Sequence, residues 1–349
     1  MHDTVASPPA IRFRDRQIEM MHGAGGKASR RLIEGLLAPL LCGSSSEPLG
    51  DAAEVSVNGA TIAITADSFV VNPLAFPGGS IGELAVNGTV NDLAVSGARA
   101  SAMVVTYILE AGLATEVLES EVRAMSRAAC AAGVAIAGGD TKVVEHGKAD
   151  RMYITTAGVG RPIPGVRLSA RSARPGDAVL VSGPIGDHGI TILLARGELD
   201  LEADLHSDTR PVIDLVEALA RAAAPGLRWM RDPTRGGVAT TLNEFARDAR
   251  LSVHLFEDRV PVRGEVRGAC ELLGLDPLHI ANEGQFLAVV AREYADRALE
   301  ALQSAPGGEA ARIIGEVREQ PACAVLASTP YGGTRIVDML VGDPLPRIC

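Results

Sequence analysis

The sequence has few aromatic residues, few cysteines and no long apolar run, and each shortage excludes a class of protein. Aromatic side chains make up 3% of its 349 residues, so hydrophobic cores must be built from Ala, Val, Leu and Ile. Its five cysteines are widely spaced and form no Cys-x-x-Cys pair, which argues against a zinc site and a secreted disulfide framework. No apolar run is long enough to span a bilayer, and the N-terminus lacks the apolar core of a signal peptide. We therefore expect a soluble, cytoplasmic protein without a membrane partner.

Basic residues are also in the minority. The chain has 43 acidic and 33 basic residues, a formal net charge of −10, and no long basic block. Nucleic acid is therefore not an expected partner. A chain of this length is too long for one ordinary core, so two domains are predicted. Aliphatic composition and 38 glycines suit α/β or α+β layers with close backbone contacts.

The first half of the chain predicts a sheet covered by helices. Two alternating runs flank Asn58-Gly59, a pair typical of a tight hairpin turn. A helical stretch at 81–95 is interrupted by the polar pair Asn91-Asp92, which suggests one face against a sheet and one edge facing a site. The predicted strands are 54–57, 61–65, 101–109, a short buried strand at 134–137, and 152–160, and a second helix is predicted at 115–132.

A composition shift at 161–165 marks the expected linker to a second unit. Strands are expected there at 178–182, 251–256, 285–291 and about 311–317, and helices after Gly189, at 209–223, after Gly237, and near 263–274 and 293–304. The predicted organisation is a variable extension at 1–16, a first domain at 17–165, a second at 166–338, and a mobile tail at 339–349.

A glycine-rich segment, 22–27, precedes the periodic run that begins at Leu32. It is compatible with an anion-binding loop at a helix start and equally with a flexible loop. It is not a Walker loop, because Met21 occupies the first glycine position and Ala28 replaces Ser/Thr. Gly158-Val159-Gly160 is not a dinucleotide loop, because the prolines that follow prevent the required helix.

Five aspartates lie at strand ends, at glycine-rich turns or in a small-residue helix. Each alone is compatible with a turn or cap residue. Together they are what a magnesium-bound phosphate needs: carboxylates for the metal and backbone amides for the phosphate. Lys142 adds positive charge for a transferring phosphoryl group. The sequence thus predicts an ATP and Mg²⁺ site built around these aspartates: Asp51, Asp67, Asp92, Asp140 and Asp232.

The chain ends in Pro344-Leu345-Pro346-Arg347-Ile348-Cys349. Two prolines disfavour a helix or central strand, so this segment is interpreted as an arm with a nucleophilic thiol at its tip, or as an unimportant frayed end. Cys130 and Cys270 are expected to be small core residues.

Four other polar residues are left without a catalytic role. His22 and His188 each sit beside glycine and are expected to pack or to bind phosphate. Arg235 is compatible with a phosphate contact or with a carboxylate across the domain seam. Glu244 is expected to be an exposed or capping charge on a helix.

Beyond these features, the motifs of the chain resemble, in order from about residue 20 to the end, those of the HypE family of hydrogenase maturation proteins. That family belongs to the superfamily of aminoimidazole ribonucleotide synthetase, selenophosphate synthetase and thiamine monophosphate kinase. The ATP-site motifs are shared in looser form by the superfamily, whereas the terminal Pro-Arg-Ile-Cys is far more specific. The matching segments are 50–53, 65–69, 76–79, 88–94, 139–142, 232–237, 281–284 and 346–349.

The resemblance implies a two-domain α+β fold. The N-terminal sheet would pair with a second copy to form a β-barrel in a homodimer, the C-terminal domain would be an α/β sandwich, and ATP would lie between the domains. It implies metal or phosphate roles for Asp51, Asp67, Asp92 and Asp232. Nucleotide-site neighbours would be Asn91, Asp140, Thr141, Arg235, Gly236 and Gly237, and catalytic residues Cys349, Lys142 and Glu283. The segment 23–26 resembles the family's mobile flap.

The implied reaction explains the tail. A partner, HypF, would carbamoylate the terminal cysteine, and the chain would dehydrate the product to a thiocyanate using ATP, with Glu283 as base. The cyanide would pass to iron on the HypC–HypD complex. Two alternatives remain: another superfamily enzyme, such as a small-molecule kinase or a selenophosphate synthetase, and a non-enzymatic carrier. A selenophosphate synthetase would carry a reactive cysteine or selenocysteine in the segment 22–26, which has none.

Overall fold

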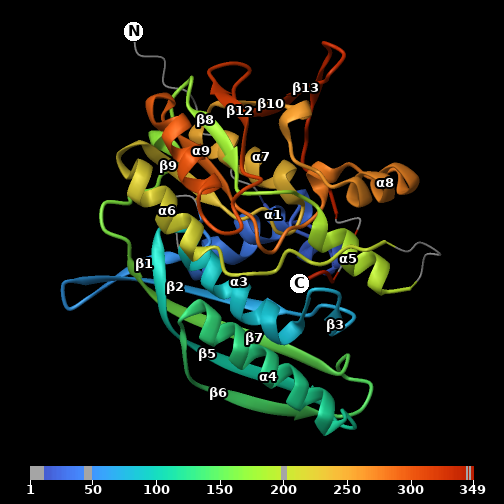
Figure 1. The fold of residues 1–349 in the computed structure, drawn as a ribbon. Helices are drawn as coiled ribbons and strands as arrows, with labels where there is room; N and C mark the ends of the chain where they lie inside the picture. The colour runs from blue at the N-terminus through green and yellow to red at the C-terminus, as the bar shows by residue number, and fades with distance from the viewer. Residues whose placement is uncertain (1–11, 43–48, 198–202, 343–344, 346) are drawn as a thin grey trace.

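Two β-sheets, each covered by helices, organise the chain (Figure 1). The structure, a computed structural model, describes residues 12–42, 49–197, 203–342, 345 and 347–349. Most of the predicted extension at 1–16, and both tail prolines, Pro344 and Pro346, lie outside the described residues. The first sheet has the strand order β1-β2-β7-β5-β6 and the second β14-β13-β10-β12-β8-β11-β9.

The N-terminal sheet begins with the predicted hairpin. Asn58 and Gly59 both have positive φ, 51° and 81°, and join paired strands, so this prediction is confirmed. The parallel pair β5 and β6 is connected by α4, which ends at Gly133 in the left-handed conformation. The elements are β1 (Ala53–Val57), β2 (Ala60–Phe69), β5 (Ala98–Glu110), α4 (Thr115–Ala132), β6 (Ala135–Val144) and β7 (Met152–Pro162).

The prediction of a short buried strand at 134–137 is wrong. The strand β6 continues through Gly138 to Lys142 and is exposed along almost its whole length. A bulge at Ala137, opposite Met103 and Val104, shifts the register, and the pairing with β5 resumes at Gly138. Because β6 is an edge strand, the hydrophobic start of this segment does not become a buried core strand.

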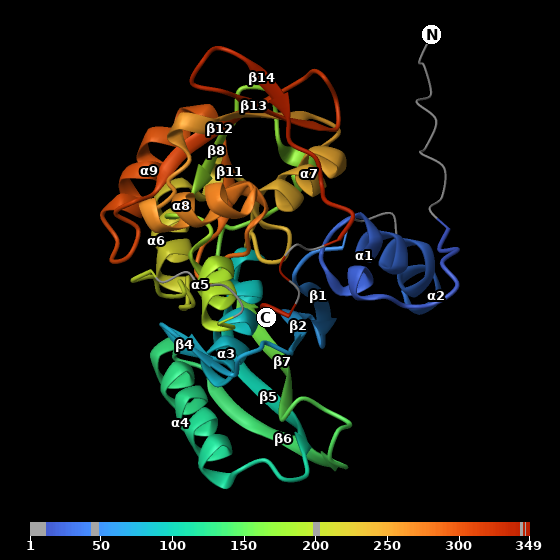
Figure 2. The same ribbon diagram turned by 90° about the vertical axis from the view of Figure 1, so that its right-hand side faces the viewer.

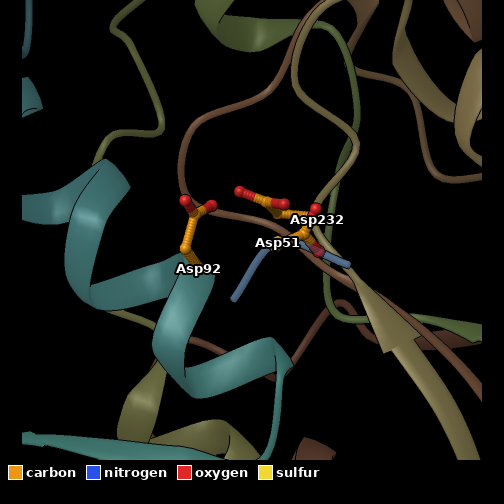
Figure 3. Close-up of side chains that lie close together, drawn as sticks. All are labelled: Asp51, Asp92 and Asp232. Carbon is orange, nitrogen blue, oxygen red and sulfur yellow. The ribbon is translucent and has the colours of Figure 1, made fainter. Parts of the chain in front are cut away.

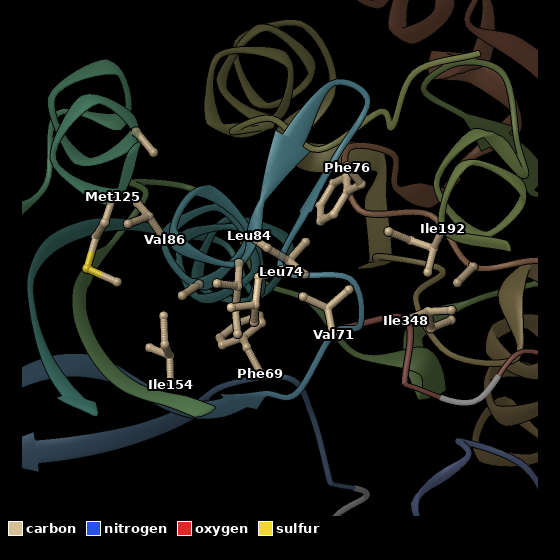
Figure 4. Packing of buried hydrophobic residues seen from close by; sticks show 14 of the residues in the cluster. Phe69, Val71, Leu74, Phe76, Leu84, Val86, Met125, Ile154, Ile192 and Ile348 are labelled. Atoms are coloured by element: carbon tan, nitrogen blue, oxygen red, sulfur yellow. The ribbon is translucent and has the colours of Figure 1, made fainter. Parts of the chain in front are cut away.

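Helix α3 (Ile81–Val95) covers one face of this sheet together with α4, at the predicted position. Their shared core contains Phe69, Leu84, Met125 and Ile154 (Figure 4). Gly88 lets the helix approach the sheet, because a Cβ atom there would lie 2.9 Å from the Phe69 ring. The short pair β3 (Ala75–Phe76) and β4 (Gly79–Ser80) precedes the helix.

The second unit is a sheet between two helical layers. Alternate side chains of β8 point to opposite faces, as a strand requires: Ala178 and Leu180 pack with α6 and α9, whereas Val179 and Val181 pack with α7. The sheet consists of β8 (Ala178–Val181), β9 (Leu227–Arg231), β10 (Ser252–Phe256), β11 (Leu287–Val290), β12 (Arg312–Arg318), β13 (Ala324–Ser328) and β14 (Thr334–Ile336). The helices are α5 (Asp187–Ala195), α6 (Ile213–Ala223), α7 (Gly237–Ala249), α8 (Gly264–Leu273) and α9 (Ala295–Gln303).

Three of these strands, β9, β13 and β14, were not among the strands predicted from the sequence. They lie at the two ends of the sheet. Of the two cysteines expected in cores, Cys270 is buried, which confirms that prediction, but Cys130 is exposed on α4. The periodic position of Cys130 gave no sign that it lies on the solvent side of the helix.

The glycine-rich segment docks on the end of the second unit (Figure 2). The helices that follow it are α1 (Lys27–Leu32) and α2 (Ala38–Leu41). The amides of Lys27 and Ala28 donate to the carbonyls of Leu340 and Val341. Within the described part of the chain, no helix combines the length and hydrophobicity needed to cross a membrane.

Candidate functional site

Three carboxylates from separate parts of the chain meet between the two units (Figure 3). Asp51 precedes β1, Asp92 lies on α3 and Asp232 follows β9. One oxygen of each lies within 4.8 Å of the others. The structure therefore brings together three of the four residues predicted to bind metal.

Neighbouring side chains hold these carboxylates in place. The Thr65 hydroxyl oxygen lies 2.7 Å from the Asp51 carbonyl oxygen and 2.9 Å from Asp92 Oδ2, and its one hydrogen is shared between these acceptors. Arg231 Nε donates to both Asp51 oxygens, at 2.8 and 3.1 Å, and its Nη1 donates to Glu244 Oε2 at 2.8 Å. The expectation that Glu244 is an exposed or capping charge is thus wrong, because the helix α7 turns it toward Arg231.

The carboxylates raise one another's pKa. Burial raises the pKa of Asp92 well above its usual value, and the charges of Asp232, Asp51 and Asp67 raise it further. Burial and the Asp51 charge raise the pKa of Asp232 to about 8. Crowded carboxylate oxygens are the hard ligands that Mg²⁺ prefers, so the donor set fits that ion.

Asp67 and Glu283 flank the cluster. Burial raises the pKa of both carboxyl groups, and for Glu283 the Asp232 and Asp67 charges add to this effect. Glu283 is 4% exposed, and among the described residues no group hydrogen-bonds to its Oε1. The main-chain amide of Glu283 donates to Asp208, which fixes the position of the loop. A buried carboxyl with a free oxygen at this position is suited to proton transfer.

The predicted site residues on β6 lie elsewhere. The register places Asp67, Thr156, Val105 and Gly139 in one row across four neighbouring strands, so β6 lies roughly 14 Å from β2. Asp140 shares its row with Ser68 on the face opposite to α3. The side chains of Asp140 and Lys142 are 58% and 67% exposed and pair with each other at 2.5 Å.

Because β6 is separated from the cluster, Lys142 does not approach the carboxylates of its own chain. Thr141 lies between Asp140 and Lys142 on this strand and is likewise exposed. The sequence could not reveal this, because β6 is adjacent to β5 rather than to β2.

Four residues predicted at the nucleotide site lie at the seam between the units: Asn91, Arg235, Gly236 and Gly237. Gly236 and Gly237 have φ values of 77° and 59° at the start of α7, and a Cβ on Gly237 would lie 2.6 Å from the carbonyl oxygens of Leu278 and Ile280. Arg235 Nη1 donates to the carbonyl of Gly23, so it anchors the glycine-rich segment. These features keep the loop backbone close to the cluster.

Asn91 is buried and connects main-chain segments across the seam. Its Nδ2 donates to the carbonyls of Arg210 and Glu283, and its Oδ1 accepts from the amide of Val212. Its assignment to the nucleotide site stays a prediction, because its amide group is engaged by protein.

The tail is docked against both units, at Val70 and Asn72 of the first and at α5 of the second. Cys349 is half-buried, and its main-chain carboxylate oxygen accepts a hydrogen bond from the amide of Val70, three residues beyond Asp67. Ile348 is 2% exposed and packs with Ile192 and Val71 (Figure 4). His188 Nε2 lies 2.7 Å from the Ile348 carbonyl oxygen. The role of His188 in holding the tail was missed, since only the fold brings α5 to the C-terminus.

Comparisons with known proteins agree with this architecture. Models of AIR synthase related proteins match residues 49–161 (N-terminal domain) and 174–327 (C-terminal domain). Carbamoyl dehydratase HypE of Azotobacter vinelandii is 48% identical over 337 residues, covering 97% of this chain and 98% of the relative. The chain belongs to the HypE family.

Solved structures of HypE proteins share the fold. A HypE–HypF complex contains a chain with a TM-score of 0.83 and 43% identity, covering 88% of this chain and 99% of that one. A HypE structure in complex with ATP has a TM-score of 0.79 and 43% identity, covering 95% and 100%. The predicted HypE-family resemblance and two-domain fold are thus confirmed, while the exact domain boundaries stay predictions.

Replacing Arg231 should destabilise this HypE-family protein, because Asp51 and Glu244 would lose their shared cation. We expect Arg231→Met to lower the free energy of unfolding by about 2–3 kcal/mol, below the loss for a fully buried pair since these side chains keep some exposure. Urea denaturation measures this. The double variant Arg231→Met/Glu244→Gln should recover part of the loss, and strictly additive losses would contradict the ion-pair explanation.

His188 should make stability depend on pH. Burial lowers its pKa to about 4, whereas the unfolded chain has a pKa of about 6.5. Because the unfolded state binds the proton more readily, the neutral His188 stabilises the folded state fully above about pH 6.5. This contribution to the free energy of unfolding is lost as pH falls toward 4. The pKa of Asp208, raised to about 6, acts in the opposite direction.

We therefore compare the chain with His188→Gln, in which the Asp208 contribution should remain. Between pH 7 and 4, the stability difference between them should shrink by on the order of 3 kcal/mol. Urea denaturation at several pH values measures this difference, and parallel pH profiles would contradict the expectation.

Proposed function

We propose that this chain converts a carbamoyl group on the sulfur of its own Cys349 into a thiocyanate in an ATP-dependent reaction. The docked tail carries the proposal, because Cys349 is hydrogen-bonded to the amide of Val70, three residues beyond Asp67, and packs against the core that both units share. The relatives' printed activity, carbamoyl dehydratase, and the ATP complex of one HypE protein support it.

The chemistry requires activation of a poor leaving group. The oxygen of the S-carbamoyl group attacks the terminal phosphorus of ATP, ADP leaves, and the nitrogen gives up one proton. The C–O bond then breaks, phosphate leaves with that oxygen, and the nitrogen gives up its second proton to form the C≡N bond. Water is thus removed as its elements, with the oxygen in phosphate and the protons on bases.

The residues supply orientation and proton transfer. Glu283 takes a proton from nitrogen, since its raised pKa makes its carboxylate a stronger base. The aspartates at 51, 67, 92 and 232 would hold Mg²⁺, which would offset the charge of the nucleotide phosphates when bound. The Gly236 amide at the start of α7 would be available to a phosphate, whereas the Gly237 amide donates to the Thr234 carbonyl, and Arg235 anchors the glycine-rich segment at Gly23.

The partners follow from the chemistry of the group. The carbamoyl group must come from a donor, and a HypE protein is known in complex with HypF, so HypF is the proposed donor. The thiocyanate would deliver cyanide to iron on a HypC–HypD complex for a NiFe-hydrogenase. The cytoplasm is the proposed compartment.

A second copy of the chain is proposed to complete the site. The open face of the N-terminal sheet exposes Ile64, Val104 and Val159, large apolar side chains that none of the described residues covers as a layer. Strands β1 and β6 form the two edges of this sheet. A homodimeric barrel would cover these side chains, pair both edges, and bring Lys142 of one copy to the carboxylates of the other.

Mass spectrometry of the C-terminal peptide tests the reaction. After incubation with HypF, carbamoyl phosphate and MgATP, we expect a carbamoyl adduct on Cys349 that loses the elements of water. Cys349→Ala should abolish both species, whereas the control Cys130→Ala, which removes an exposed cysteine on α4, should retain both. Asp92→Asn should accumulate the carbamoyl form. A persistent cyano adduct in Cys349→Ala would overturn the proposal.

A mixing experiment tests the shared site. Lys142→Ala and Asp92→Asn should each be inactive alone. Mixed dimers should regain about a quarter of the activity, because half of them are heterodimers and each contains one intact site. No recovery after confirmed subunit exchange would mean that Lys142 does not act across the dimer.

The two alternatives predict different outcomes. A non-enzymatic carrier would show no magnesium-dependent ATP turnover on a carbamoylated tail. A small-molecule kinase would turn over ATP in Cys349→Ala as well as in the unchanged chain. The docked tail favours the dehydratase over both, because Cys349 is held against the N-terminal unit of its own chain at Val70.

A further inference from the structure

The last residues of the chain bind like an added β-strand. The Val70 amide donates to a main-chain carboxylate oxygen of Cys349 at 2.9 Å, and the Asn72 amide donates to the carbonyl of Arg347 at 3.3 Å. The residue numbers run in opposite directions, so the pairing is antiparallel. These bonds tie the tail to the N-terminal unit through its main chain, which is how many proteins bind an extended peptide.

The C-terminal unit also binds main-chain carbonyls of the tail. His188 Nε2 lies 2.7 Å from the carbonyl oxygen of Ile348, and Arg196 Nη2 donates to that of Arg347 at 2.9 Å. A carbonyl only accepts, so Nε2 carries the hydrogen and Nδ1 accepts from the Ser207 hydroxyl, 2.8 Å away. His188 is fully buried, so water cannot replace this donor.

Side chains of the tail add apolar and ionic contacts to these main-chain bonds. Leu345 and Ile348 are buried in the core shared by both units. A Cβ on Gly189 would lie 3.3 Å from Leu345 and 2.6 Å from Ile280, so the α5 backbone leaves just enough room for the tail. Arg347 Nη1 pairs with Asp150 at 2.8 Å.

We infer that His188 and Arg196 form a latch that positions the tail for dehydration and must open before Cys349 meets an external donor. The inference rests on the proposed function for its consequence, but the latch itself is a property of the tail contacts. Both residues lie on or directly after α5, so one element of the C-terminal unit grips two successive carbonyls. Dehydration needs the gripped state, whereas carbamoylation by a separate protein needs the released one. The strength of the latch therefore sets the fraction of chains in the gripped and the released state.

Thiol reactivity of Cys349 tests the latch without any nucleotide or partner. The background is the full chain with the exposed cysteines removed, Cys42→Ser/Cys130→Ser/Cys323→Ser. In it, His188→Phe and Arg196→Met should each raise the rate of reaction with an aromatic disulfide reagent about tenfold, since each loses one buried hydrogen bond to the tail. His188→Gln, which can still donate, should restore most of the protection. Arg221→Met, a control on α6, should leave the rate unchanged.

A second measurement separates the latch from a general loss of structure. With HypF, carbamoyl phosphate and MgATP, the latch variants should take up carbamoyl at least as fast as the background and dehydrate it several-fold more slowly. Unchanged thiol reactivity in both His188→Phe and Arg196→Met would overturn the latch. So would an equal increase at Arg221→Met, or a failure of His188→Gln to restore protection. If the background chain takes up carbamoyl but never dehydrates it, the proposed function fails, while the reactivity result still decides the latch.

Discussion

Repulsion between buried carboxylates is the constraint on which the seam between the two units depends. Asp92 is brought to the seam by α3, and Asp51 and Asp232 approach it from either side. Without compensation, such crowding would drive the units apart. Arg231 and Thr65 provide part of this compensation, and a divalent cation suits the remaining charge. The same arrangement that strains the seam thus suits the proposed binding of a metal-bound phosphate.

The composition of α3 follows from its position at this seam. It is packed against the N-terminal sheet on one side and contacts α6 on the other, and all but two of its residues are buried. Gly88 admits the sheet, and Asn91 binds main chain of the second unit. A helix with larger residues at Gly88 would be pushed away from the sheet, and a fully apolar one would leave no carboxylate at the seam.

The tail is held in place by strand-like pairing. Main-chain hydrogen bonds give a defined position for Cys349, and the buried side chains of Leu345 and Ile348 anchor the segment next to it. Because much of the grip comes from only a few bonds, release would not require unfolding of either unit. Such pairing suits the proposed double role of the terminal residue, as substrate carrier and as part of the site.

Elements with local signals could be predicted from the sequence. The turn at Asn58-Gly59, the helix at 81–95 and the aspartate-bearing motifs were all read from neighbouring residues, and the motif order indicated the family. Which of these residues meet, in contrast, depends on the packing of distant segments. The tertiary structure placed Lys142 on an edge strand away from Asp92, turned Glu244 toward Arg231, and set His188 against the tail. Such pairings depend on strand order and helix rotation, which are properties of long-range packing and leave no mark in a stretch of adjacent residues.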